Sequence, residues 1–330
     1  MLLFTVAALL LAAGLCLGTA EIICRLLKIP FPATTNPTEN AVAQFDPELG
    51  WSYIPNRSVI QKYPPAARDV AVHFDDIGAR VRAPGHRRDP AAPTVLFVGC
   101  SFTMGHGVLY EETVAGQLES TPHFPFQAVN LGVQGYGTDQ VFLLLKRHFK
   151  KFNTKAVVYT YLGAHPVRNA TDDPRLIYRQ RNLNYVGSKP RFALATDGTV
   201  YLANRPVKFE ARAYSRLRAS LRYVAARHGP VVTPDLTRAL IQAMKAFVES
   251  NGATFIVIDW QQTDLKIRRL SPCLEGLSVN LVDTRVQSPP GWWNWRIHPE
   301  DPHPDARAYH HVARLLLEEF KRLNLFFPHS

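Results

Sequence analysis

Short, uninterrupted apolar runs recur along this chain, and they constrain its fold more than any other feature. A run of this length without polar alternation is typical of a parallel strand that is buried on both faces of a sheet. The runs are TVLFVG from Thr94, FQAVNLG from Phe126, KAVVYTYLG from Lys155, ATFIVIDW from Ala253 and VNLVDT from Val279.

Segments with helical periodicity separate these runs. DQVFLLLKRHFKKF follows Thr138 and carries its apolar residues at helical spacing. TPDLTRALIQAMKAFVESNG begins with a capping Thr233 and ends at Gly252. Strand–helix alternation at this spacing predicts an α/β fold of three layers, in which a central parallel sheet carries helices on both faces.

The N-terminal segment is expected to lie outside this fold. Residues 1–20 contain no charged side chain, and an apolar helix of that length matches the thickness of a bilayer core. No basic residue precedes the run, which favours an uncleaved membrane anchor, whereas Gly18 and Ala20 would permit cleavage as a signal peptide. We therefore expect residues 1–28 to be a transmembrane anchor or signal, and the Pro-, Thr- and Asn-rich residues 29–45 to be a linker.

Residues 46–330 are expected to form one domain with an insertion. Residues 169–229 interrupt the strand–helix rhythm, so we place the insertion there, over the carboxyl edge of the sheet. PRFALATDGTVYLANRP, from Pro190, predicts a hairpin that turns at Asp197 and Gly198. An Arg-rich amphipathic helix is predicted to follow the hairpin.

The charge balance limits the partners only weakly. A net charge of +11 is compatible with nucleic acid, an anionic membrane surface or an acidic polymer as partner, or with solubility alone. The sequence contains no zinc-finger spacing, RNA-binding signature or basic–aromatic stripe, so no nucleic-acid partner is expected. The spacing of the four cysteines fits neither a metal site nor a dense disulfide framework.

Polar residues follow the predicted strands directly. Ligands of open α/β sheets bind outside the carboxyl ends of the strands, and Ser101 comes just after the first apolar run. Its hydroxyl is a candidate nucleophile whose neighbouring amides face a developing oxyanion, or else it caps the next helix. Gly132 and Gly135 in the following loop let the backbone approach a substrate closely, or form a simple tight turn.

A histidine and an aspartate precede the C-terminal amphipathic helix. His303 lies just before Pro304, which would hold its ring at the start of the helix, facing the sheet edge. Asp301 is two residues away and can hold and orient the imidazole. With His298 and Glu300 the pair also forms a possible surface cluster or metal site, but no open ligand set is evident and no metal is expected.

Together and in this order, these segments resemble the SGNH (GDSL-type) hydrolase family, which has a flavodoxin-like fold. VLFVGCSFTMGHGV is similar to the family's first block, with Ser101 at the nucleophile. VNLGVQGYGT is similar to the second, with Gly132 at the glycine that donates to the oxyanion. DPHPDARAYHHVA is similar to the last, with Asp301 and His303 as acid and base. FDPELGWSYIPN and the N-terminal span resemble a membrane-anchored bacterial branch of the family.

Two positions depart from the family pattern. Cys100 replaces the Asp that precedes the family's nucleophile, a position that is usually structural. The third block usually supplies an Asn that donates to the oxyanion, and the corresponding stretch here is YLGAHPVRNA. His165 falls nearest to that position and Asn169 follows four residues later. A neutral histidine can donate one ring N–H, so both residues are candidate oxyanion donors.

The resemblance implies acyl transfer without a metal or an organic cofactor. His303 would take the proton as Ser101 attacks an ester carbonyl. We expect a serine-dependent acyl- or acetylesterase that acts on carbohydrate or lipid esters of the cell envelope and is held at the membrane, facing the periplasm or the cell exterior. An O-acetyltransferase of an envelope glycan shares every catalytic residue. A catalytically silent binding protein with the same fold is the other alternative, favoured by the missing Asn and by Cys100.

Overall fold

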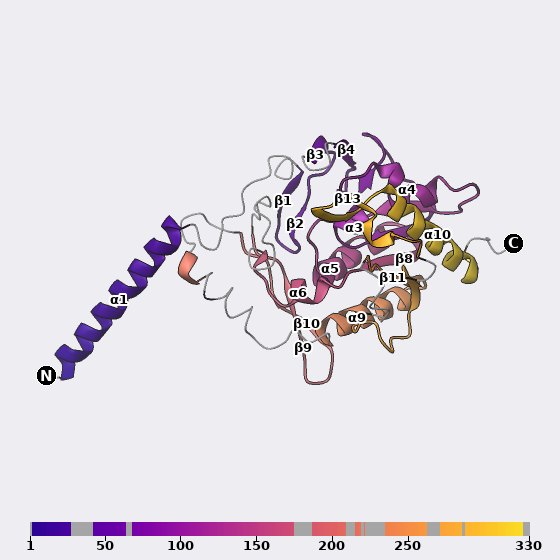
Figure 1. Cartoon of the computed structure of the whole chain (residues 1–330). Coiled ribbons are helices and arrows are strands. Elements are labelled where there is room, and N and C mark those ends of the chain that lie inside the picture. The colour runs from indigo at the N-terminus through magenta and orange to yellow at the C-terminus, as the bar shows by residue number, and fades with distance from the viewer. Residues whose placement is uncertain are drawn as a thin grey trace.

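The architecture is a central sheet with helices on both faces (Figure 1). It comes from a computed structural model that describes residues 2–27, 42–63, 68–174, 187–208, 215–218, 221, 235–262, 271–285 and 288–325. Within these ranges the main sheet has eight strands. In order across the sheet they are β12 (Asn280–Asp283), β11 (Thr254–Asp259), β8 (Asn153–Tyr161), β6 (Pro93–Val98), β7 (Gln127–Asn130), β5 (Arg80–Val81), β4 (Arg68–Phe74) and β3 (Ser58–Tyr63).

The predicted parallel sheet is confirmed for the strands from β12 to β7, which are mutually parallel. The other end of the sheet differs, because β5, β4 and β3 pair antiparallel. Only a few residues separate these three strands in the sequence, and so short a connection can join only antiparallel neighbours, whereas parallel strands need a crossover. The whole sheet is therefore mixed.

The parallel strands have the flavodoxin-like order. Numbered along the chain from β6, they lie in the order 2-1-3-4-5 across the sheet. In such sheets the ligand crevice opens at the carboxyl ends of the strands where the winding direction reverses. That point lies between β6 and β8, which are hydrogen-bonded neighbours.

Two helices cover each face of the parallel strands. Helix α4 (Val114–Glu119) and helix α10 (Ala306–Arg322) pack together on one face, and α5 (Thr138–His148) and α9 (Asp235–Ser250) pack together on the other. The carboxylate of Asp305 begins α10 by accepting hydrogen bonds from the first amides of the helix. Helix α9 ends before Gly252, whose φ of 77° lies in the left-handed region that suits glycine.

Short elements complete the described structure. The hairpin predicted at Asp197 and Gly198 is confirmed by two antiparallel strands. The Arg-rich helix predicted after it falls largely outside the described residues, as does most of the predicted linker. The remaining elements are β1 (Ala43–Asp46), β2 (Gly50–Tyr53), α3 (Ser101–Met104), η2 (Tyr110–Glu112), η3 (Phe149–Lys151), α6 (His165–Asn169), β9 (Arg191–Leu194), β10 (Val200–Asn204), η4 (Trp292–Asn294), β13 (Arg296–His298) and β14 (Asp301–Pro304).

The N-terminal helix α1 (Leu2–Leu26) projects away from the domain (Figure 1). Its stretch from Phe4 to Leu26 is long and apolar enough to cross a membrane, and none of it is buried inside the protein. A membrane anchor and a signal sequence both meet this description. The Glu21 carboxylate near its end accepts hydrogen bonds from the Ser215 hydroxyl and the Leu217 amide.

Candidate active site

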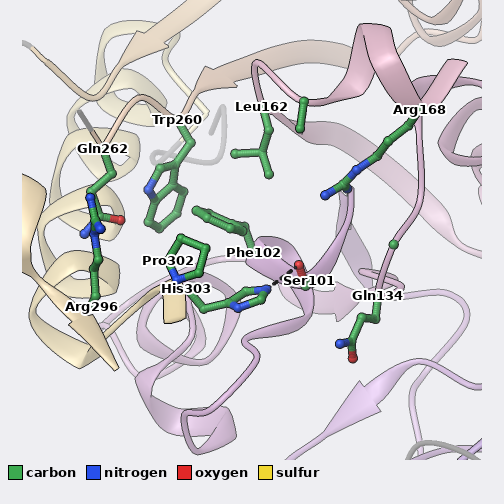
Figure 2. A pocket seen from close by; sticks show the side chains of 12 residues that line it. Ser101, Phe102, Gln134, Leu162, Arg168, Trp260, Gln262, Arg296, Pro302 and His303 are labelled. Atoms are coloured by element: carbon green, nitrogen blue, oxygen red, sulfur yellow. Dashed lines mark hydrogen bonds between the residues drawn. The ribbon is translucent and has the colours of Figure 1, made fainter. Parts of the chain in front are cut away.

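Three of the predicted site residues form one hydrogen-bonded row. The Nε2 atom of His303 lies 2.9 Å from the Oγ atom of Ser101, and its Nδ1 atom lies 2.5 Å from Oδ1 of Asp301. Figure 2 shows the contact between Ser101 and His303 at the floor of a pocket. The fold thus assembles the geometry of a Ser–His–Asp triad from two distant segments of the chain.

The position of Ser101 follows from the end of strand β6. The strand stops at Val98, the chain turns through Gly99, and Ser101 is the first residue of α3. A Cβ atom on Gly99 would collide with the Thr103 side chain, so this sharp turn requires glycine. The turn leaves Ser101 nearly buried and yet lining the pocket at the carboxyl edge of the sheet.

The position of His303 follows from β14 and the start of α10. The His303 amide and ring both bond Oδ1 of Asp301, and the ring also packs against Phe102. Burial acts to raise the pKa of Asp301, but the hydrogen bonds from His303 outweigh it and lower the pKa to about 2. The ionised carboxylate accepts the Nδ1 proton, which leaves Nε2 free to accept the proton of the Ser101 hydroxyl.

A second histidine, which the sequence analysis did not identify, packs against the triad. The ring of His106 lies 4.1 Å from that of His303, centroid to centroid, and its Nε2 lies 3.8 Å from Oδ2 of Asp301. Burial, and then the neighbouring charge of His303, lower the pKa of His106 well below its usual range, so His106 is neutral. The two histidines and Asp301 also bring three possible metal ligands together. Both ring nitrogens of His303 are engaged within the triad, however, which fits proton transfer better than metal binding.

A pocket of about 310 Å³ opens above the triad. Its walls come from the loops after β6, β7, β8 and β11 and from β13 and β14, as expected for the carboxyl edge of this sheet. The lining residues are Ser101, Phe102, Gln134, Gly135, Leu162, Ala164, Arg168, Trp260, Gln262, Arg296, Pro302 and His303.

Gly132 does not line this pocket, contrary to the expectation that it donates to an oxyanion. Its amide donates instead to Oδ1 of Asn130 at 3.1 Å, and the residue packs so tightly on the backbone of Met104 that no Cβ atom would fit. The glycine that reaches the pocket is Gly135, with a φ of 79°. Both glycines are predicted close-approach positions, and of the two only Gly135 is among the described residues that line the pocket.

His165 and Asn169 do not line the pocket either. The His165 ring is fully buried, and its Nδ1 lies 2.7 Å from the hydroxyl of Tyr159. Burial lowers the pKa of His165 well below its usual range, so the ring is neutral, as required of a donor, but it is directed elsewhere. The Asn169 side chain donates to the Thr237 hydroxyl at 2.7 Å. Both side chains attach α6 to its neighbours, and neither lines the pocket in front of Ser101, where an oxyanion donor is expected.

Arg168 is the side chain of α6 that does line the pocket. One of its N–H groups donates to the carbonyl of Tyr136 at 2.9 Å, which ties α6 to the loop that carries Gly135. In Figure 2 its guanidinium extends into the pocket toward Ser101. No local sequence pattern identifies Arg168 as a pocket residue, because the orientation of α6 depends on its contacts with distant segments.

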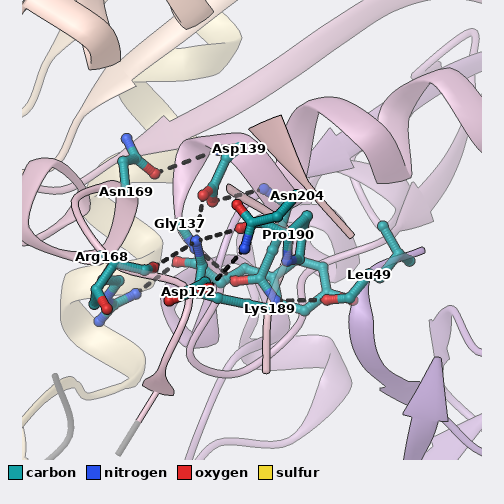
Figure 3. A network of polar contacts seen from close by, with 12 residues as sticks. Leu49, Gly137, Asp139, Arg168, Asn169, Asp172, Lys189, Pro190 and Asn204 are labelled. Carbon is teal, nitrogen blue, oxygen red and sulfur yellow. Dashed lines mark hydrogen bonds and ion pairs between the residues drawn. The ribbon is translucent and has the colours of Figure 1, made fainter. Parts of the chain in front are cut away.

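A buried polar network fixes the base of α6 (Figure 3). Its centre is an ion pair between Lys189 and Asp139, both completely buried. Lys189 also donates to the carbonyl of Pro190 at 2.9 Å, and the Asp139 amide donates to Oδ1 of Asn169 at 3.3 Å. Buried charges are stable only when they are paired and hydrogen-bonded, so this network holds the start of α5, helix α6 and the segment at Lys189 together and thereby positions Arg168.

Fold and site together define an α/β protein with flavodoxin-like strand order and a Ser–His–Asp row at the carboxyl edge of its sheet.

No family model and no curated protein matches the sequence. Several solved structures are similar to it. A member of the lipolytic protein G-D-S-L family from Veillonella parvula is 11% identical, with a TM-score of 0.41 over 70% of this chain and 100% of that one. A lipase/acylhydrolase from Enterococcus faecalis is 14% identical, with a TM-score of 0.39, over 70% of this chain and 96% of that one. The acetylxylan esterase Axe2 from Geobacillus stearothermophilus is 13% identical, with the same TM-score and coverage.

Proposed function

We propose that this protein is a serine esterase of the SGNH (GDSL-type) kind. Its substrates are carbohydrate or lipid esters of the cell envelope, as an acyl- or acetylesterase, and α1 holds it at the membrane with the domain facing the periplasm or the cell exterior. The observation that carries the proposal is the hydrogen-bonded row of Ser101, His303 and Asp301 at the floor of a pocket.

The chemistry follows from the positions of the donors and acceptors. His303 Nε2 takes the hydroxyl proton as Ser101 Oγ attacks the ester carbonyl, and the Asp301 carboxylate stabilises the resulting imidazolium. When the tetrahedral intermediate collapses, His303 gives the proton to the departing alcohol. A water molecule then attacks the acyl-serine by the same steps in reverse and releases the acid.

The oxyanion of the tetrahedral intermediate needs hydrogen-bond donors in front of Ser101. We assign the amide of Ser101, which lies in the first turn of α3 and has no helical acceptor, together with the amide of Gly135 and the guanidinium of Arg168. Gly135 and Arg168 both line the pocket. A cationic donor makes a stronger hydrogen bond to an oxyanion than a neutral amide does. Arg168 would therefore supply what the family's missing Asn normally provides.

Two alternatives use the same fold. An O-acetyltransferase would pass the acyl group from Ser101 to a glycan hydroxyl instead of water, with the same residues. A silent binding protein was favoured by the missing Asn and by Cys100. Arg168 weakens the first of these arguments. The second is weakened because Cys100 is completely buried and does not line the pocket, so it removes no group from the site.

Labelling with a fluorophosphonate tests the proposal on the full-length protein in detergent. A labelled adduct is expected at Ser101, and it should be lost in Ser101→Ala but retained in Ser250→Ala, an exposed serine at the end of α9. A panel of aryl and sugar esters should then be hydrolysed. Acyl transfer to added glycan in preference to water would identify the transferase, whereas the absence of both labelling and turnover would identify the binding protein.

A further inference from the structure

One end of the pocket carries polar groups that the esterase mechanism does not use. Trp260 and Gln262 follow strand β11, and Arg296 begins β13. Together they line the same pocket as Ser101. Figure 2 shows Gln262 and Arg296 at the end away from Arg168, with the rings of Trp260 and Phe102 between them and Ser101. We call the three residues Trp260, Gln262 and Arg296 the distal wall.

Two groups of the distal wall are buried without a hydrogen-bond partner among the described residues. They are the indole Nε1 of Trp260, which is 3% exposed, and the Oε1 atom of Gln262. The Gln262 orientation is fixed, because its Nε2 donates to the carbonyl of Trp295 at 2.5 Å. In Figure 2 the indole nitrogen lies on the side of the ring that faces Gln262 and Arg296. A buried donor or acceptor left unpaired is destabilising, so this end of the pocket favours a ligand that supplies one acceptor and one donor.

Arg296 also brings a positive charge to the distal wall, and no acidic side chain pairs with it among the described residues. Arg296 is partly buried, and its Nε donates to the carbonyl of Trp293 at 2.9 Å. No ion pair within the described part of the chain involves Arg296, and no acidic residue is found among the described residues that line the pocket. A guanidinium is a planar fork that matches the two oxygens of a carboxylate. The charge therefore favours an anionic group on the substrate.

Aromatic rings form the surface next to these groups. The Trp260 ring stacks on Trp292, with centroids 6.2 Å apart, and meets the edge of Phe102 at 5.5 Å. Of these rings Phe102 is partly exposed and lines the pocket, while Trp260, which also lines it, and Trp292 are buried. An aromatic lining beside a few fixed donors and acceptors suits a ring that is apolar on its faces and polar at its rim. A sugar ring has this character, whereas a long acyl chain offers no partners for the unpaired groups.

We infer that the distal wall is a subsite for a carboxylate-bearing sugar, and that the preferred substrate is an O-acylated glycan containing uronate-type residues. This inference rests on the proposed function. Arg296 receives the carboxylate, Trp260 Nε1 donates to a sugar oxygen, and Gln262 Oε1 accepts from a sugar hydroxyl. The ester on the same or the neighbouring sugar then lies over Ser101.

The test compares two substrates that differ only in charge. One is an O-acetylated galacturonate trisaccharide, and the other is the same trisaccharide with its carboxylates converted to carboxamides. Acetate release by the full-length protein should give a kcat/KM about 10–100-fold higher for the carboxylate form, because hydrogen bonds to charged groups contribute about 1.5–3 kcal/mol. This ratio should fall to near one in Arg296→Gln. It should persist in Arg314→Gln, a matched change at an exposed arginine of α10 that pairs with Glu318.

The possible failures can be told apart. A ratio near one in the wild type, with normal hydrolysis of p-nitrophenyl acetate, overturns the subsite and leaves the esterase standing. A preference for a phosphorylated glycan over the carboxylate form overturns the carboxylate assignment. If no ester is hydrolysed, the proposed function fails. The subsite is then tested by calorimetry, which measures binding of the deacetylated trisaccharide to the Ser101→Ala variant. Binding that is lost on adding Arg296→Gln, and weakened on adding Trp260→Phe, supports it, whereas no binding overturns it.

Discussion

The Nε2 atom of His303 lies 2.9 Å from the Oγ atom of Ser101, although the two residues are 202 positions apart in the chain. The contact joins the start of α3, just after the first parallel strand, to β14, just before α10. It forms only when the whole sheet is assembled, since β7, β8 and β11 with their loops lie between the two segments in the sequence. Reactivity at Ser101 is therefore also a sensitive probe of correct folding.

The first prediction concerns this contact. Ser101→Ala and His303→Ala should each abolish hydrolysis of short-chain aryl esters, because the nucleophile and its base act as one unit. The double variant should be little slower than either single one, as measured by kcat on p-nitrophenyl acetate. Additive losses, or activity that survives in Ser101→Ala, would exclude the serine mechanism.

The second prediction separates the two acidic residues near the base. Asp301→Asn should lower kcat by about 10²–10⁴-fold, because an amide no longer holds the Nδ1 proton and the correct tautomer. Glu300→Gln is the matched control, since the exposed Glu300 lies outside the row and its amide bonds only His298. If Glu300→Gln proves the more damaging change in a pre-steady-state assay, the acid has been misassigned.

The third prediction concerns the oxyanion donor. Arg168→Met should lower kcat by about 10²–10³-fold with little change in KM, as expected for a contact made mainly in the transition state. His165→Ala should instead lower the free energy of unfolding, because it empties a buried site beside Tyr159. Urea unfolding and steady-state kinetics on both variants distinguish the roles. A larger kcat loss in His165→Ala than in Arg168→Met would return the donor role to the histidine.

The fourth prediction is a pH dependence of stability that arises at His148, the last residue of α5. Burial, and then the charges of Lys151 and Arg147, lower the pKa of His148 from 6.5 to about 3. Below pH 6.5 the unfolded chain gains a proton at this residue that the folded protein does not, so stability falls as the pH drops toward 3. At pH 5 the loss from this residue is about 2 kcal/mol.

Thermal unfolding at pH 7.5 and pH 5 measures this effect. The decrease in Tm between the two values should be smaller in His148→Gln than in the wild type, because glutamine does not titrate. His310→Gln, a change at an exposed histidine of α10, should keep the full decrease. Equal decreases in all three proteins would contradict the assignment.

The fifth prediction concerns the N-terminal helix. The apolar side chains of α1 are exposed instead of packed into the core, so a chain without residues 1–28 should be soluble and should keep its kcat. Membrane flotation of the full chain and of the deletion variant tests the anchor. An insoluble or unfolded deletion variant, next to a full chain that folds in detergent, would show that the helix belongs to the fold.

Local sequence patterns were sufficient for the strands and for the triad. A buried parallel strand is recognisable because it lacks polar alternation, and Ser101 follows such a strand directly. Asp301 and His303 are two residues apart, so the chain itself holds them together. The edge strands were less predictable, because the alternating residues of β4 are typical of a strand but do not indicate the direction in which its neighbours pair.

The sequence by itself predicted the α/β class and the placement of Ser101, Asp301 and His303 at the carboxyl edge of the sheet, because each of these depends on a short segment. Only the tertiary structure showed which neighbouring residues lie near Ser101 and His303: Arg168, Gly135 and His106. It also showed that His165 and Gly132 do not line the pocket, and that Trp260 and Arg296 do. The physical reason is that α6 is oriented by distant partners, including the Thr237 hydroxyl and the buried Lys189–Asp139 pair. Which side of a short helix or loop faces a pocket depends on such long-range contacts, and no local pattern of residues records them.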